Sequence, residues 1–147
     1  MSTYASLHFH IVFSTKNRLP LIDLSWEQRL HEYLGGTAGG LDGFPQGIGG
    51  AQDHIHMLVG LKTTHCIATF VRELKKGASA WIHKELGISP FSWQEGYGVF
   101  SVSATARDQV KQYIANQREH HRRLSFRDEF LEMLKRAGIA YDPKYLE

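Results

Sequence analysis

Two short segments of the chain alternate between apolar and polar residues, which is the pattern of β-strands whose two faces meet different surroundings. In the first, residues 7–14, the apolar face holds Leu7, Phe9, Ile11 and Phe13, and the other face holds His8, His10, Val12 and Ser14. In the second, residues 54–61, Ile55 and Met57 share one face, and His54 and His56 share the other. Such strands must lie in a sheet that helices cover on its apolar face.

Helical spacing of apolar residues predicts the covering helices. Residues 64–86 carry a long apolar stripe, so we expect an amphipathic helix there. Shorter helices are expected over residues 26–34, with Ser25 as N-cap, over residues 105 to about 122, and over residues 126 to about 137. Thr105 with Asp108, and Ser125 with Asp128, have the spacing of N-terminal capping motifs. Residues 96–103 have the composition of a third strand.

Glycine is concentrated in one stretch, residues 35–50, which contains eight of the fourteen glycines. We expect Gly35 and Gly36 to end the preceding helix and a loop to follow, with at most a bulged strand at residues 44–48. The stretch lacks the phosphate-binding G-x-x-x-x-G-K-[ST] motif, so we expect no nucleotide cofactor. Together the elements predict one α+β domain over residues 1–147, a sandwich of one sheet with helices mainly on one face.

Composition limits the location of the protein and the classes of partner. The N-terminus lacks the pattern of a signal peptide, no run reaches the roughly 18 apolar residues of a membrane span, and Cys66 has no second cysteine to pair with. We therefore expect a soluble, cytoplasmic protein with no membrane partner. The formal net charge of +2 does not by itself indicate nucleic acid, so any DNA-binding argument depends on where the basic residues lie.

A candidate chemical site combines the second strand with the helix over residues 105–122. On the strand, His54 and His56 direct two imidazoles toward one point, and two imidazoles supply half of the ligands of a compact metal site. On the helix, one stripe holds Val110, Tyr113, Ile114, Gln117 and His121. Tyr113 and Gln117 lie one turn apart on this inward face, and a buried tyrosine hydrogen-bonded by a glutamine would explain them without any catalytic role.

Five runs of the sequence resemble a known family. These runs are HFHIVFSTKNR, GGAQDHIHMLVGLK, VRELKKGASAWI, SWQEGYGVFSVS and QYIANQ. From about Tyr4 to Glu119 they resemble, in the same order, the single-tyrosine HUH transposases of bacterial insertion sequences, where U denotes a hydrophobic residue between two histidines. This family includes the REP-associated tyrosine transposases. The resemblance implies a ferredoxin-like, RRM-like antiparallel sheet and a C-terminal helix that carries the catalytic tyrosine.

The resemblance also implies roles for individual residues. Tyr113 is the nucleophile, His54 and His56 are metal ligands, and Gln117 is the third ligand; Asp53 matches the family but receives no catalytic role. The ligand types favour Mg²⁺ or Mn²⁺, although the sequence leaves Zn²⁺ open. Family members are usually homodimers in which the tyrosine helix of one subunit completes the metal site of the other. Attack on a phosphodiester would leave a 5′-phosphotyrosine and a free 3′-hydroxyl without ATP.

The expected partner is single-stranded DNA that contains a hairpin, which would place the bound protein at the nucleoid. Basic residues expected to contact DNA are Lys16, Arg18, Lys75, Lys76, Lys111, Arg118, Arg122 and Arg123. Phe44 or Trp93 would stack on unpaired bases if its side chain is exposed, although phenylalanine and tryptophan side chains are more often buried in the core. His8 and His10 are expected to support the site by hydrogen bonding. His121, one turn beyond Gln117, is expected to support the site or a phosphate rather than to bind the metal.

Two other functions remain open at this point. The first is a domesticated nuclease that acts on chromosomal repeats, which the sequence barely separates from a transposase. The second is a catalytically idle domain that binds hairpins of single-stranded DNA or RNA on the same scaffold.

Overall fold

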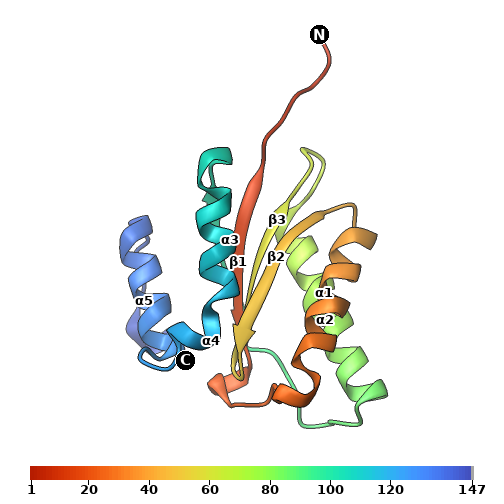
Figure 1. Cartoon of the computed structure of the whole chain (residues 1–147), viewed down its shortest axis with the longest axis vertical. Coiled ribbons are helices and arrows are strands. Elements are labelled where there is room, and N and C mark those ends of the chain that lie inside the picture. Colours follow the sequence, from red (N-terminus) through yellow and green to blue (C-terminus); the bar gives the residue numbers. More distant parts are fainter. Residues whose placement is uncertain (147) are drawn as a thin grey trace.

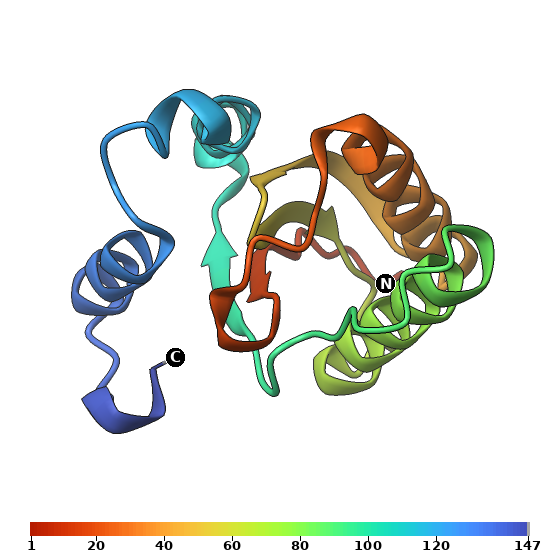
Figure 2. The same cartoon turned by 90° about the horizontal axis from the view of Figure 1, so that it is seen from below.

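Four strands form one antiparallel sheet in the order β2-β3-β1-β4 (Figures 1 and 2). The strands are β1 (His8–Ser14), β2 (Phe44–Ala51), β3 (His54–Gly60) and β4 (Gly98–Val102). The computed structural model describes residues 1–146. The two histidine-bearing strands, β1 and β3, are the central pair, and their register sets Val12 opposite His56 and Ser14 opposite His54.

Helices cover both faces of this sheet, so the expectation of helices mainly on one face was wrong. The two long helices, α1 (Leu24–Gly40) and α2 (Ile67–Glu85), lie on one face, and α3 (Arg107–Ala115), α4 (Gln117–His120) and α5 (Phe126–Ala137) lie on the other (Figures 1 and 2). The βαββαβ order with this strand order is ferredoxin-like, which confirms the predicted α+β class. Within residues 1–146, no helix is both long and apolar enough to cross a membrane.

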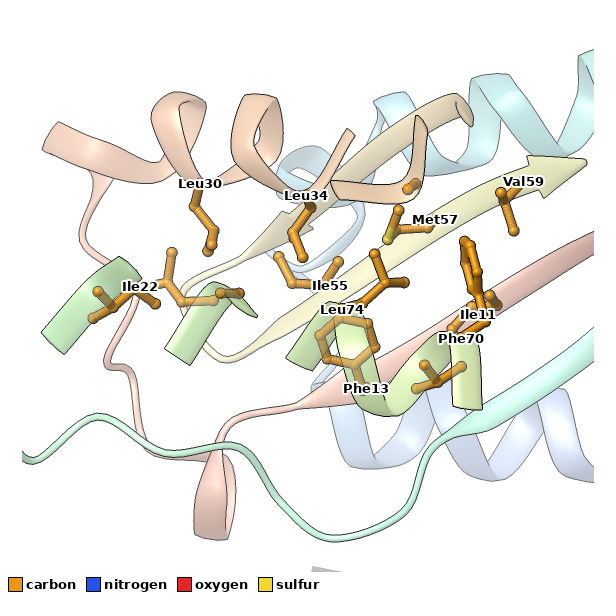
Figure 3. Packing of buried hydrophobic residues seen from close by; sticks show 14 of the residues in the cluster. Ile11, Phe13, Ile22, Leu30, Leu34, Ile55, Met57, Val59, Phe70 and Leu74 are labelled. Atoms are coloured by element: carbon orange, nitrogen blue, oxygen red, sulfur yellow. The ribbon is translucent and has the colours of Figure 1, made fainter. Parts of the chain in front are cut away.

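The main hydrophobic core lies between the sheet and the two long helices. Ile11 and Phe13 of β1 and Ile55 and Met57 of β3 are almost fully buried there, against side chains such as Leu34 (Figure 3). The alternation predicted from the sequence is therefore confirmed. Since neighbouring strand residues point to opposite faces, the histidines of both strands face α3, α4 and α5.

The helix α1 is longer than predicted at its C-terminal end. It runs through Gly35 and Gly36 to Gly40, and its N-cap is Asp23, whose carboxylate accepts from the Ser25 backbone N–H at 2.8 Å, rather than Ser25. Each mid-helix glycine costs about 1 kcal/mol relative to alanine. Burial of Leu34 and Ala38 on the continuing stripe offsets that cost, so the predicted stop at Gly35 was wrong.

The glycine-rich stretch forms a strand, β2, where a loop was expected. Its register shifts between Pro45 and Gly47, so the predicted bulge is present, but the strand extends to Ala51. A Cβ at Gly49 would lie 2.1 Å from the carbonyl oxygen of Ile114. Only glycine therefore allows α3 to pack this close to the sheet.

The helix predicted over residues 105–122 is broken. It consists of the 3-10 turn Ala104–Ala106, then α3, then α4 after a break at Asn116, whose φ and ψ are −96° and 18°. The capping motif expected at Thr105 does not form, because α3 begins after Ala106 without a side-chain cap. In contrast, Ser125 caps α5 by accepting from the backbone N–H of Asp128, as predicted.

Candidate active site

The strand histidine His54 is held by the residue that precedes it. Its Nδ1 lies 2.7 Å from Oδ1 of Asp53, which places the ring proton on Nδ1 and leaves the lone pair on Nε2. That Nε2 lies 2.8 Å from Oε1 of Gln117, another acceptor. Two acceptors this close repel each other unless a cation or a proton lies between them, so this pair fits a bound cation.

The second strand histidine, His56, is held from the neighbouring strand. Its Nδ1 lies 2.7 Å from Nε2 of His10, so a supporting role for His10 agrees with the geometry. Burial lowers the pKa of His56 to about 4 and that of His10 to about 3. Both rings are thus neutral near pH 7, which is the form that binds metal ions.

The carboxylate of Glu129 stands at the centre of the site. Its Oε1 lies 3.1 Å from Nε2 of His56 and 2.9 Å from Nε2 of His121, and its Oε2 accepts from Nε2 of Gln117 at 3.0 Å. Burial opposes its ionisation, but hydrogen bonds from His121 and His56 hold the pKa of Glu129 well below its usual range. The carboxylate is therefore charged although it is only 1% exposed.

These groups form a cluster that could hold a metal ion. One ligand atom from each of His54, His56, His121 and Glu129 lies within 4.8 Å of every other. Imidazole and carboxylate are both common ligands of divalent cations, and the cluster is almost enclosed. The residues present therefore fit a divalent cation.

Tyr113 lies beside the cluster in the same chain. Its hydroxyl donates to Oε2 of Glu129, and its ring centroid lies 5.8 Å from that of His56. Burial, followed by the hydrogen bond and the charge of Glu129, raises the pKa of Tyr113 above its ordinary value of about 10. In this arrangement the side chain is a neutral phenol.

A cleft gives access to Tyr113 from outside. It has a volume of about 380 Å³ and lies between α3 and α5, with His10, Tyr113 and Glu129 among the side chains that line it. Tyr113 is only half buried, so the phenol is not sealed in hydrocarbon. A chain segment that enters this cleft reaches the phenol directly.

The basic residues expected to contact DNA are distributed over both faces. Lys111, Arg122 and Arg123 are exposed on the side of the sheet that carries Tyr113. Lys75 and Lys76 belong to α2 on the opposite face, and the Lys75 ammonium donates to the carbonyls of Gln94 and Gly96 at 2.7 and 2.8 Å.

The other expected contacts occupy the ends of the sheet and its β2 edge. Arg118 pairs with Glu27, so this ion pair joins α4 to α1 around edge strand β2. Lys16 and Arg18 lie in the 3-10 turn Lys16–Arg18 that follows β1. Phe44 is 68% exposed, whereas Trp93 packs against Phe13.

Glu129 was missed by the sequence analysis, whereas the contact of His121 with Glu129 agrees with the supporting role considered for that histidine. A signal for Glu129 existed, because the stripe Phe126, Glu129, Phe130, Met133 and Leu134 has helical spacing and sets one carboxylate among apolar residues. A buried carboxylate needs charged or hydrogen-bonding partners. The strand histidines His54 and His56 were the residues in the sequence available to partner this carboxylate.

Comparisons with known proteins place the chain in a family. A family model described as "Transposase IS200 like" matches residues 3–117. A protein of Deinococcus radiodurans named as a candidate transposase is 24% identical, with a TM-score of 0.64, over 80% of this chain and 95% of that one. A REP-associated tyrosine transposase, solved bound to a REP hairpin, is 16% identical, with a TM-score of 0.61, over 82% of this chain and 74% of that one.

The two structural likenesses show a shared fold, and the family model covers most of the sequence. No curated protein matches the chain significantly. Because the family model matches residues 3–117, more than half of the 147 residues, this chain belongs to the IS200-like transposases.

Proposed function

We propose that the chain cleaves and rejoins single-stranded DNA at ends that contain a hairpin, with Tyr113 as the nucleophile. His54, His56 and Gln117 would hold a divalent cation. One observation carries the proposal: the phenol of Tyr113 and the imidazole of His56 contact the same buried carboxylate, and the phenol also lines an open cleft. Membership of a transposase family supports this reaction class.

The proposed step is an in-line displacement at phosphorus. The phenolic oxygen of Tyr113 forms a bond to phosphorus, the bond from phosphorus to the 3′-oxygen breaks, and that oxygen takes up a proton as the phenol loses one. The 5′-phosphate stays linked to Tyr113, so a later 3′-hydroxyl can reverse the step. A bound divalent cation would polarise the scissile phosphate and weaken the repulsion felt by the nucleophile.

Residues around the strand histidines would keep their rings in place. Asp53 holds the proton of His54 on Nδ1, and His10 occupies the corresponding position behind His56. Exposed Lys111, Arg122 and Arg123, on the same side as Tyr113, would neutralise phosphates of the DNA strand. A hairpin substrate is supported by the relative that was solved bound to a REP hairpin.

The test is covalent capture of DNA. A hairpin-containing single strand, labelled on its 3′ side, should form an adduct with the chain in Mn²⁺ or Mg²⁺ that survives denaturing electrophoresis. Tyr113→Phe should abolish the adduct and keep hairpin affinity within about twofold, because one hydroxyl contributes little to a phosphate-dominated interface. Tyr97→Phe, which changes a tyrosine outside the cluster, should form the adduct at the wild-type level.

Two results would contradict the proposal. An adduct that persists in Tyr113→Phe would place the nucleophile elsewhere. Tight hairpin binding by the wild-type chain without any adduct, in either metal, would identify a binding domain rather than an enzyme.

A further inference from the structure

We infer that Glu129 and His121 bind the same cation as His54 and His56, and that this set of three imidazoles and one carboxylate selects a transition-metal ion over Mg²⁺. The inference rests on the proposed function in taking the two strand histidines as ligands. It adds two residues to Gln117 and the strand pair. Both new residues lie in the segment after residue 117, which the family model does not match.

Distances within the cluster agree with one shared cation. Oε1 of Glu129 lies 3.1 Å from Nε2 of His56, 2.9 Å from Nε2 of His121 and 3.7 Å from Nε2 of His54. In an octahedral site with bonds of about 2.1 Å, neighbouring ligand atoms lie roughly 3.0 Å apart, and positions remain for Gln117 and for a phosphate oxygen. The contacts of Glu129 are already near this spacing, and every pair of ligand atoms in the cluster lies within 4.8 Å.

The packing of α5 fixes the carboxylate in this position. Phe126, in the first turn of α5, stacks on the ring of His54 with 4.4 Å between ring centroids, and Ser125 caps the helix. Gln117 donates to Oε2 of Glu129, so Oε1 is the oxygen turned toward the imidazoles. Because these groups are nearly enclosed, the carboxylate does not depend on water for its orientation.

The types of ligand atom in the cluster determine which cation fits it. Magnesium prefers oxygen ligands and retains bound water, whereas imidazole nitrogen suits manganese, iron and zinc. A ligand set with three nitrogens therefore disfavours Mg²⁺.

Calorimetric titration of the metal-free full chain, without DNA, tests this inference. We expect the wild-type chain to bind MnCl₂ at least about tenfold more tightly than MgCl₂. Glu129→Gln should weaken Mn²⁺ binding by about tenfold or more, and His121→Gln should weaken it in the same direction. Glu132→Gln, one turn further along α5 and exposed, is the matched control and should bind Mn²⁺ like the wild type.

A second measurement needs no variant and remains decisive if Glu129→Gln does not fold. X-ray absorption of the zinc-loaded wild-type chain should fit three imidazole nitrogens and at least one oxygen. Two imidazoles, or unchanged Mn²⁺ affinity in a folded Glu129→Gln chain, would overturn the inference. Equal affinities for Mg²⁺ and Mn²⁺ would do the same.

Failure of this inference can be told apart from failure of the proposed function. If Tyr113 forms the DNA adduct while Glu129→Gln binds Mn²⁺ normally, only the extended ligand set is wrong. If Glu129→Gln loses Mn²⁺ but the wild-type chain never forms an adduct, the cation site stands and the strand-transfer activity does not.

Discussion

Hydrogen bonds behind the two strand histidines decide which nitrogen each ring presents to the cluster. The Asp53 carboxylate faces Nδ1 of His54, and the ring of His10 faces Nδ1 of His56. In both cases Nε2 is turned toward Glu129 or Gln117. Partners of this kind typically change metal affinity by 10- to 100-fold when they are removed.

Asp53→Asn tests this orienting role. The amide can still accept from Nδ1 but lacks the charge that makes the ring a stronger ligand, so we expect Mn²⁺ affinity to fall by about tenfold. Calorimetry on the metal-free chain measures it. Asp42→Asn is the control, because Asp42 is exposed, lies outside the cluster and has a φ of 65° that asparagine tolerates. Equal loss in both variants would show a general charge effect instead.

Residue positions in the site were partly predictable from the sequence. His54, His56, Tyr113 and Gln117 were predicted together, and the structure brings them together in one chain. The strand pair follows from period-two geometry, which is local. Glu129 was not predicted, because the stripe in residues 126–134 shows a carboxylate among apolar residues but does not show that α5 folds back onto the strand histidines.

At the level of elements, the position of α3, which carries Tyr113, depends on β2, because β2 has glycines where α3 crosses it. The carbonyl of Ile114, next to Tyr113, lies where a Cβ of residue 49 would be. The side chain of Lys111 approaches Gly47 in a similar way, at 3.3 Å from its ideal Cβ. The spacing between β2 and α3 therefore sets how far Tyr113 reaches toward the cluster.

Gly49→Ala should push α3 away from the sheet. Overpacking of this kind costs about 1–3 kcal/mol, and we expect that loss in the free energy of unfolding measured in urea, together with a lower yield of DNA adduct. Gly36→Ala is the matched control, since a Cβ there meets nothing within 4 Å inside α1. It should stabilise the chain by roughly 0.5–1 kcal/mol. A fully stable Gly49→Ala chain would contradict this account of the strand.

Element boundaries were predicted well where packing agrees with local propensity and poorly where it does not. The long helix, the two central strands and the cap at Ser125 were found at or near their predicted positions. Gly35 failed as a helix stop because Ala38, further along, is buried. The break at Asn116 also could not be predicted, since the stripe that ends in Gln117 and His121 keeps helical spacing across it, and only the backbone angles of Asn116 show the break.

In the whole molecule, one chain supplies every residue of the cluster. Tyr113 contacts the carboxylate that contacts His56, and Gln117 contacts His54, all within the same chain. The composite homodimer implied by the resemblance is therefore not needed to assemble these groups. Whether two chains associate for another purpose is a separate prediction.

Mixing two inactive variants tests the one-chain arrangement. Tyr113→Phe and His56→Ala should not restore adduct formation together, because neither chain then holds both the nucleophile and the ligand. Proof that subunits can exchange, from tagged chains that co-purify, or proof that the chain is a monomer, is the necessary control. Recovery of a substantial part of wild-type activity would show instead that two chains share each site.

The close crossing of α3 over Gly49 has a consequence for how activity is judged among related genes. A single base change turns a glycine codon into one for alanine, and at this position it would displace Tyr113, the proposed nucleophile, while every side chain of the proposed site stays intact. Copies of such a gene could therefore lose the proposed strand-transfer activity although their histidines and their tyrosine are unchanged. A comparison of gene copies that have accumulated mutations should therefore require glycine at position 49 as strictly as it requires the reactive side chains.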